Sequence, residues 1–168
     1  RERGMRTIAL TGSSGKTSTK DMLAQILETF GPTVAPVGSF NNEIGVPLTA
    51  CRSNENTSFL VSEMGTRGLG HISWLTSIVT PDVAMVLNVG NAHLGEFGSR
   101  EVIAQAKGEI VEALSVDGWA VLNAADTLVA GMAPRTRGHI AWFSPDADHH
   151  RPDADIEVWA ESTHADDL

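Results

Sequence analysis

The sequence predicts an α/β fold in which a mostly parallel sheet is flanked by helices. Two observations carry this prediction. Short apolar runs with strand character alternate along the chain with longer segments in which apolar residues recur at helical spacing. Such alternation is typical of parallel strands joined by helical crossovers, which are strongly right-handed and place helices on the faces of the sheet.

Each strand is expected where a short apolar run is bounded by turn residues. The run at residues 7–10 comes directly before a glycine-rich loop, and the runs at 58–63 and 83–89 are the strongest of those that follow. The weakest is 33–37, which comes after Gly31 and Pro32. The expected strands cover residues 7–10, 33–37, 58–63, 83–89, 119–123, 139–143 and 156–160.

The helices are expected between these strands. Residues 16–30 have apolar residues every three to four positions and are ended by Gly31 and Pro32. Ser99 is suited to cap a helix over residues 100–114. The segment 38–47, rich in Gly and Asn, is expected to be a loop. The remaining expected helices cover residues 70–79 and 127–133.

The composition excludes several classes of protein. A chain of 168 residues fits one domain, and 42% apolar residues are enough for a core. The net charge of −9 would repel phosphate backbones, so we expect no nucleic-acid partner. No apolar run approaches the roughly 18 residues of a membrane span. Cys51 is the single cysteine, which excludes an internal disulfide and suggests a reducing, cytoplasmic location.

The sharpest motif is the segment TGSSGKTS at residues 11–18, which predicts a P-loop-type nucleotide site because it follows a strand and opens a helix. Lys16 is expected to reach the β- and γ-phosphates, and the Thr17 hydroxyl to bind Mg²⁺. The motif has the short form GxxGK[ST], since Leu10 stands where the longer form has glycine; a plain helix-capping turn is the alternative. The residues expected to bind the nucleotide are Gly12, Ser13, Ser14, Gly15, Lys16, Thr17 and Ser18.

Two further polar residues follow expected strands. Glu63 ends the run 58–63, and His93 follows the run 83–89. Because ligands bind beyond the carboxyl ends of parallel strands, we expect both residues at the same sheet edge as Lys16. A carboxylate beside a nucleotide suits Mg²⁺, and His93 could hold a second divalent ion or a substrate. Taken singly, Glu63 could be a solvated carboxylate and His93 a loop histidine with no special role.

Lys107 is unusual for its position in the expected helix 100–114. It lies four residues after Ile103 and three before Ile110, so it borders or joins the inward-facing stripe. An isolated buried ammonium is costly, so such a lysine must snorkel, find an anion or be chemically altered. A lowered pKa would also make the amine of Lys107 nucleophilic. A lysine that snorkels at the edge of the stripe is the alternative.

Together these segments resemble the Mur ligases, the ATP-dependent amide-bond ligases of peptidoglycan precursor synthesis. The resemblance covers most of residues 7–126 and implies the central-domain fold of that family. Within the family, the runs NNEIGVP and AKGEI are most similar to members that add D-alanyl-D-alanine to UDP-N-acetylmuramoyl-tripeptide. The matching segments are residues 11–17, 40–47, 63–65, 91–94, 106–110 and 121–124.

The resemblance implies roles around ATP and two Mg²⁺ ions. Lys16 would contact the ATP phosphates, while Thr17 and Glu63 would bind the first Mg²⁺. His93 would be a ligand of a second Mg²⁺. Lys107 would be carbamoylated by CO₂, which converts its amine into a carboxylate-like metal ligand. Lys16, Lys107 and His93 would thus form the catalytic set.

The resemblance also implies the reaction and the other domains. Asn41 and Asn42 would lie near the acceptor substrate, and Asn123 near the adenine. ATP would phosphorylate the tripeptide carboxylate, and the amine of D-alanyl-D-alanine would attack the acyl phosphate. Residues 1–168 would be the central ATP-binding domain of a three-domain ligase whose N-terminal UDP-binding and C-terminal domains are absent. We expect the fragment alone not to ligate.

Three other functions remain alternatives on the sequence. A folylpolyglutamate synthetase-like ligase shares the nucleotide chemistry but adds glutamate to folate, and the pair Asn41 and Asn42 argues against it. A nucleotide-binding module without chemistry would bind ATP and transfer no phosphoryl group. A small-molecule kinase would need a hydroxyl acceptor and a catalytic base, and the sequence locates neither.

Overall fold

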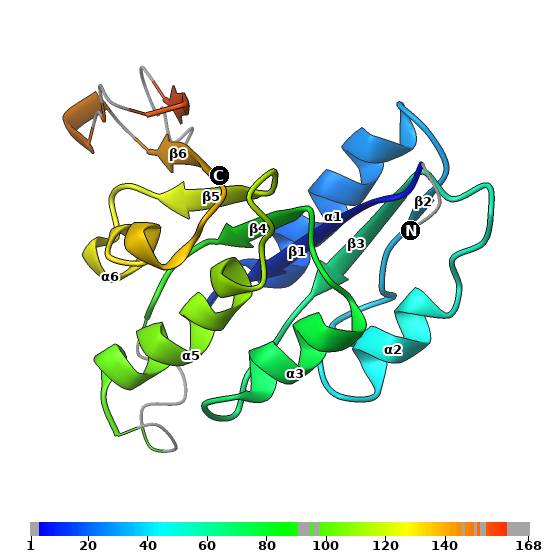
Figure 1. The fold of residues 1–168 in the computed structure, drawn as a ribbon, viewed down its shortest axis with the longest axis horizontal. Helices are drawn as coiled ribbons and strands as arrows, with labels where there is room; N and C mark the ends of the chain where they lie inside the picture. The colour runs from blue at the N-terminus through cyan, green and yellow to red at the C-terminus, as the bar shows by residue number, and fades with distance from the viewer. Residues whose placement is uncertain are drawn as a thin grey trace, which may run out of the picture.

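The computed structural model describes residues 4–90, 95, 98–145, 147–149, 151 and 154–160. Their strands form a seven-stranded sheet in the order β2-β3-β1-β4-β5-β6-β7 (Figure 1). Every neighbouring pair in this sheet is parallel. The α/β fold predicted from the sequence is therefore confirmed.

The elements follow the predicted order. The strands are Arg6–Thr11 (β1), Thr33–Val34 (β2), Phe59–Glu63 (β3), Val83–Val86 (β4), Trp119–Asn123 (β5), His139–Ser144 (β6) and Ile156–Trp159 (β7). The helices are Lys16–Glu28 (α1), Gly45–Ala50 (α2), His71–Ile78 (α3), Arg100–Glu112 (α5) and Thr127–Ala130 (α6), with short 3₁₀ turns at Ala133–Arg135 (η1) and Ala147–His149 (η2). No helix in the described ranges is long and apolar enough to cross a membrane.

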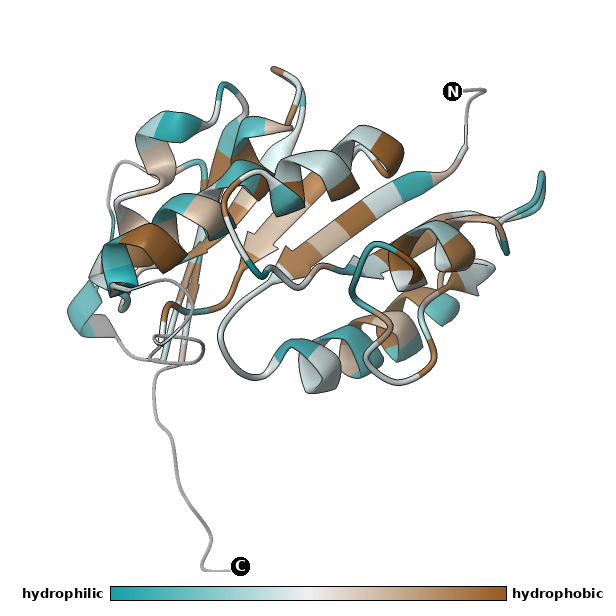
Figure 2. Cartoon of the chain, turned by 90° about the horizontal axis from the view of Figure 1, so that it is seen from below, coloured by the Kyte–Doolittle hydropathy of each residue, from teal (hydrophilic) through white to brown (hydrophobic). Residues whose placement is uncertain are grey.

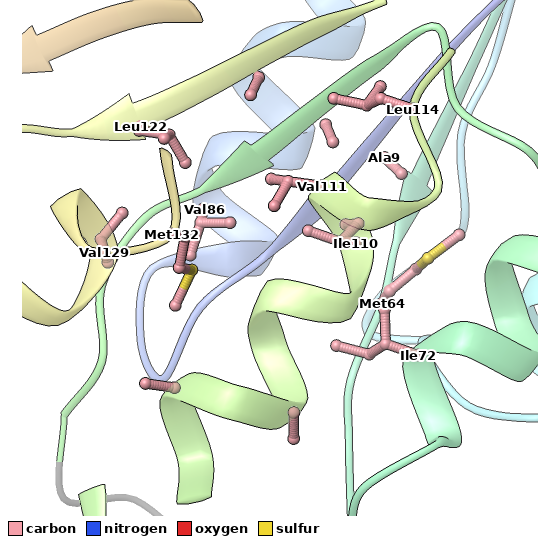
Figure 3. Packing of buried hydrophobic residues seen from close by; sticks show 14 of the residues in the cluster. Ala9, Met64, Ile72, Val86, Ile110, Val111, Leu114, Leu122, Val129 and Met132 are labelled. Carbon is pink, nitrogen blue, oxygen red and sulfur yellow. The ribbon is translucent and has the colours of Figure 1, made fainter. Parts of the chain in front are cut away.

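Two cores lie on opposite faces of the sheet, because successive strand side chains point to opposite sides. On one face, α3 and α5 pack on strand residues such as Ala9 and Val86 (Figure 3). On the other face, α1 lies over Leu10, Val61 and Leu87. Figure 1 shows α1 behind the sheet and α3 and α5 in front of it. Seen from below, the apolar strands lie between these helical layers (Figure 2).

One predicted loop is wrong at its end. Residues 38–47 were expected to be irregular, but helix α2 begins at Gly45. The side chain of Asn42 accepts hydrogen bonds from the N–H groups of Ile44, at 3.2 Å, and Gly45, at 2.9 Å, and so starts the helix. Pro47 is tolerated because it falls in the first turn, where the backbone N–H groups have no helical partner.

The predicted cap of the long helix is confirmed. The Ser99 hydroxyl accepts a hydrogen bond from the N–H of Val102 at 3.4 Å, and α5 starts at the next residue, Arg100. Helix α5 contacts both β4 and β1. This packing brings the middle of α5 under the loop that follows β1, where the candidate site lies.

Candidate functional site

The phosphate loop joins β1 to α1 at the carboxyl edge of the sheet. Gly15 directly precedes α1 with φ of +76°, a left-handed conformation that glycine adopts without strain. Gly12 lies close to the chain leaving β4, since a Cβ at this position would come within 3.0 Å of the Leu87 Cβ. The backbone conformation therefore favours glycine at position 15, and a larger residue at position 12 would press on the chain that leaves β4.

A side chain from the neighbouring strand holds this loop in shape. Asn88 follows β4, and its Oδ1 accepts hydrogen bonds from the backbone N–H groups of Ser13, at 2.9 Å, and Ser14, at 3.0 Å. Its Nδ2 donates to the Ser14 carbonyl at 3.2 Å. The sequence alone predicts no role for Asn88, because its contact with the loop depends on the pairing of β1 with β4.

Two lysine ammonium groups converge on one carbonyl oxygen. Lys16 Nζ donates to the Gly12 oxygen at 2.8 Å, and Lys107 Nζ donates to the same oxygen at 3.0 Å. Lys107 is only 4% exposed, which confirms its predicted inward position. Burial, and then the nearby charge of Lys16, lowers the pKa of Lys107 from 10.5 to about 8. The pair forms a ready anion site in a strongly acidic chain.

Glu63 is a buried carboxylate with one unpaired oxygen. It ends β3 and is 1% exposed, and its Oε1 accepts a hydrogen bond from Asn41 Nδ2 at 2.7 Å. Its Oε2 is buried and has no hydrogen-bond partner within the described ranges. Leaving a carboxylate oxygen in this state is costly, so a cation at this position would relieve it. Thr17 and Glu63 line the same hollow of about 440 Å³.

These donors fit Mg²⁺. That ion prefers oxygen ligands and is usually held by one or two carboxylates together with substrate phosphates and water. Glu63 and the Thr17 hydroxyl supply such oxygens. In the part of the chain that the structure describes, no three His, Cys, Asp or Glu side chains cluster as a metal site, so phosphates and water would complete the shell. His93, the predicted ligand of a second ion, lies outside the described residues.

The two asparagines predicted near the acceptor have different contacts. Asn41 turns toward Glu63 and lies against Gly65, where a Cβ would come within 2.8 Å of the Asn41 Oδ1. The Asn42 side chain instead accepts from the N–H groups of Ile44 and Gly45, where α2 begins. Both border a second hollow, of about 280 Å³, whose lining includes Lys16, Asn41, Asn42, Arg67, His71 and Lys107.

Asn123, predicted to lie near the adenine, ends β5 and is held by two internal bonds. Its Nδ2 donates to the Leu87 carbonyl at 2.9 Å, and its Oδ1 accepts from the Ala125 N–H at 3.0 Å. Asp126 accepts from the N–H of Val89 at 2.7 Å. These bonds fix the chain that leaves β4 beside the phosphate loop, and the adenine contact stays a prediction.

A glycine in the middle of α5 has a packing reason. A Cβ on Gly108 would lie 1.8 Å from Arg135 Nη1, because the guanidinium crosses the helix at this point. Arg135 donates to the carbonyls of Ala104, at 3.3 Å, and Gln105, at 2.8 Å. Sequence reasoning missed Arg135, and the mid-helix glycine beside Lys107 was the available signal.

Sequence comparison points to the family already suggested. Residues 10–166 match the family model described as Mur ligase middle domain. The UDP-N-acetylmuramoyl-tripeptide–D-alanyl-D-alanine ligase of Mycobacterium tuberculosis (strain ATCC 25618 / H37Rv) is 48% identical over 165 residues, which are 98% of this chain and 31% of the relative. The ligase of the same name from Escherichia coli (strain K12) is 46% identical over 119 residues, which are 71% of this chain and 26% of the relative. The chain thus spans less than a third of these relatives.

Solved structures support the family at the level of the fold. UDP-N-acetylmuramoylalanyl-D-glutamyl-2,6-diaminopimelate–D-alanyl-D-alanyl ligase from Acinetobacter baumannii is 38% identical with a TM-score of 0.77, covering 83% of this chain and 31% of its own. MurF ligase from Thermotoga maritima in complex with ADP is 35% identical with a TM-score of 0.78, and the match covers 85% of this chain and 33% of that one. A mutant FPGS from L. casei, 18% identical with a TM-score of 0.60 over 84% and 45%, shares the fold alone. With its phosphate loop and the matched model, the chain belongs to the Mur ligase family, at the position of the middle domain.

Proposed function

We propose that this chain is the ATP-binding domain of a ligase that joins D-alanyl-D-alanine to UDP-N-acetylmuramoyl-tripeptide. The observation that carries the proposal is the convergence of Lys16 and Lys107 on the Gly12 carbonyl, near the buried, unpaired oxygen of Glu63. An anion site for phosphoryl groups beside a carboxylate suited to Mg²⁺ is what phosphoryl transfer requires. The name of the M. tuberculosis relative supports these substrates.

The reaction would use the chain's own residues in two steps. Lys16 would offset the charge between ATP and the tripeptide carboxylate while the γ-phosphoryl moves to that carboxylate and ADP leaves. The amine of D-alanyl-D-alanine would then attack the acyl carbon, and the amide forms as phosphate and the amine's proton depart. Thr17 and Glu63 would hold one Mg²⁺, and His93 would be a ligand of a second; such ions would supply further neutralisation of phosphate charge.

Lys107 has the chemistry needed for a carbamate. Because burial lowers its pKa to about 8, roughly a tenth of the amine is neutral at pH 7. The neutral nitrogen can add to CO₂ and lose a proton, which replaces a cation by an anion next to the phosphate loop. In the complete ligase, Lys107→Ala should then lose activity that added bicarbonate does not restore, and turnover like that of the wild type would remove the carbamate from the proposal.

The proposed reaction needs more than residues 1–168. An N-terminal domain would hold the UDP part of the substrate, and a C-terminal domain would bring the amine substrate. Asn41 and Asn42 would face the acceptor, and Asn123 the adenine side. We place the reaction in the cytoplasm, where ATP and UDP-linked precursors are found, and expect no ligation by this domain alone.

The first test is calorimetric titration of Mg·ATP, on the domain and on the complete ligase. Lys16→Ala should weaken binding at least about a hundredfold, because a charge-assisted contact to phosphate is lost while the fold is kept. Arg52→Ala is the matched control, since Arg52 donates to the Ala35 carbonyl and lies outside the lining of both hollows. Unchanged affinity in Lys16→Ala would refute the phosphate site.

Activity is tested separately on the complete ligase. Phosphate release should require both UDP-N-acetylmuramoyl-tripeptide and D-alanyl-D-alanine, and mass spectrometry should find the pentapeptide product. A complete protein that hydrolyses ATP without forming this product, or that ligates a different acid, would refute the proposed substrates while leaving the nucleotide site in place.

A further inference from the structure

The segment between β3 and α3 forms a wall of the 280 Å³ hollow, although no role follows from its sequence. Thr66, Arg67 and His71 line the hollow together with Lys16 and Lys107. Among the described residues that line it, none is acidic. In a chain with a net charge of −9, a hollow lined by the cations of Lys16 and Arg67, and by no described carboxylate, is suited to an anionic ligand.

A buried carboxylate fixes the backbone of this wall. Glu109 of α5 is 7% exposed and accepts hydrogen bonds from the N–H groups of Gly70, at 2.6 Å, and Ser73, at 2.9 Å. The start of α3 is therefore already satisfied by Glu109 and is not itself an anion site. Because α5 carries both Glu109 and Lys107, one helix sets the positions of the wall and of the buried amine.

The charged end of Arg67 is held only loosely. Its side chain is 72% exposed, and its nearest carboxylate is Glu43 Oε1, at 3.9 Å. Glu43 Oε2 also lies 3.3 Å from His71 Nε2. The pKa of Glu43 is lowered by its own backbone N–H and then by Arg67 and His71, so Glu43 is an anion at neutral pH. An exposed pair at this distance contributes little, so Arg67 can exchange Glu43 for a ligand carboxylate at small cost.

We propose that Arg67, with His71 beside it, binds a carboxylate of the peptide acceptor that does not take part in the reaction. The inference rests on the proposed function, in which Lys16 serves the reacting carboxylate and the phosphoryl group and Lys107 is carbamoylated. A guanidinium fork matches a second carboxylate in two parallel hydrogen bonds, which an ammonium cannot do. Arg67 is then a specificity-determining residue, and Glu109 is a positioning residue.

The acceptor named for the A. baumannii ligase shows what such a carboxylate would be. It contains D-glutamyl and 2,6-diaminopimelate units, and each of these amino acids has two carboxyl groups. An acceptor of this class offers a free carboxylate at its second residue and another at its third. Both candidates are carboxylates that do not react, and each lies either on the residue that carries the reacting carboxylate or on the residue before it.

The test uses the complete ligase and three acceptors. One is the natural tripeptide substrate. In the second, the free carboxylate of the second residue is amidated, and in the third, the unreacted carboxylate of the third residue is amidated. We expect amidation at one of these positions to raise KM about tenfold with little change in kcat. Arg67→Gln should raise KM for the natural acceptor by the same factor. For the acceptor whose amidation raised KM in the wild type, Arg67→Gln should cause no further rise. Arg67→Lys should recover part of the loss, and Arg52→Gln should change neither constant.

The outcomes separate this inference from the proposed function. If the wild-type complete ligase forms no product with any acceptor, the proposed function fails. If it ligates but Arg67→Gln raises KM equally for all three acceptors, or for none, the inference on Arg67 is overturned. The position whose amidation abolishes the effect of Arg67→Gln identifies which carboxylate is bound.

The positioning role of Glu109 has its own measurement. Glu109→Gln should raise KM for the natural acceptor while Mg·ATP affinity and kcat stay within about twofold, because the amide repels one of the two N–H donors and loosens the wall. Combined with Arg67→Gln, its effect on KM should not add, since both changes act on one contact. Additive effects, or an equal loss of ATP affinity, would show that Glu109 serves general stability only.

Discussion

Helices α1 and α5 both deliver a lysine ammonium group to the Gly12 carbonyl, but they do so from opposite faces of the sheet and by different means. Lys16 is the first residue of α1 and follows the phosphate loop directly. Lys107 lies buried in the middle of α5. The neighbouring Ile110 and Val111 of this helix belong to the larger core (Figure 3). A local motif positions the first amine, and tertiary packing positions the second.

The burial of the two helices follows this division. In α5, eight of 13 residues are buried, whereas in α1, also 13 residues long, the buried ones are Lys20 and Ala24. Met22 and Ile26 of α1 remain 58% and 57% exposed. The helix that begins at the phosphate loop is therefore held by few buried residues, whereas the helix that buries an amine is buried over most of its length.

An isoleucine-to-alanine substitution in each helix tests this difference in burial with the largest expected effect on stability. Ile110→Ala removes a side chain that is 0% exposed and should destabilise the domain by about 3–4 kcal/mol through lost burial and a cavity. Ile26→Ala removes one that is 57% exposed and should cost less than about 0.5 kcal/mol. Urea unfolding followed by circular dichroism measures both. Equal losses would mean that α1 is packed as firmly as α5.

The second prediction concerns the free-energy cost of burying the Lys107 amine. Its pKa falls to about 8 in the folded chain, whereas an unfolded lysine keeps its proton to about pH 10.5. Between these values the unfolded state binds more protons, so stability should rise with pH by about 3 kcal/mol across this window and show no such slope below it. Lys107→Met lacks the titrating group.

Unfolding free energies of the wild type and Lys107→Met, measured from pH 7 to 10.5, test this directly. The variant should be the more stable protein at pH 7, and its advantage should shrink as the wild-type amine loses its proton. A difference between the two proteins that does not change with pH would show that Lys107 keeps an ordinary pKa in the folded domain.

The packing of Arg135 across α5 gives an effect of intermediate size. Gly108→Ala should gain about 1 kcal/mol of helix propensity but displace the guanidinium, which donates to the Gln105 carbonyl and to Glu112, each at 2.8 Å. In an Arg135→Ala background only the gain remains. A double-mutant cycle should thus show a coupling of about 2 kcal/mol, and independent effects would mean that the contact does not constrain the helix.

The same contrast explains what could be predicted from the sequence. The strands, α1 and the phosphate loop depend on local pattern, and their order and positions were predicted. The inward position of Lys107 also followed from spacing in α5. Helix α2 was missed because it begins inside a segment rich in Gly and Asn, where the Asn42 side chain accepts from the N–H groups of Ile44 and Gly45.

Contacts between residues far apart in the sequence could not be predicted from hydrophobic spacing or local motifs. Asn88 reaches the loop 74 and 75 positions earlier, and Glu109 reaches back 39 positions to Gly70. Such contacts depend on which strands are neighbours and on how α5 lies against α3, which single-residue patterns do not encode. The sequence therefore predicts the phosphate loop better than the wall that contains Arg67 and is fixed by Glu109.

Asn88 offers the smallest and most selective test, because it ties the locally determined loop to the tertiary structure. Asn88→Asp keeps an oxygen that can accept from Ser13 and Ser14 but loses the donor to the Ser14 carbonyl and adds a negative charge. A charge about 4 Å from a phosphate in water is unfavourable by about 1 kcal/mol, so ADP affinity should fall about fivefold. The loss should shrink as salt screens the repulsion.

Asn54→Asp is the matched control for Asn88→Asp. Asn54 Oδ1 also accepts from a backbone N–H, that of Asn56 at 2.9 Å, and Asn54 lines neither hollow. A fivefold loss that does not respond to salt would indicate that Asn88 acts by shaping the loop rather than by its neutrality.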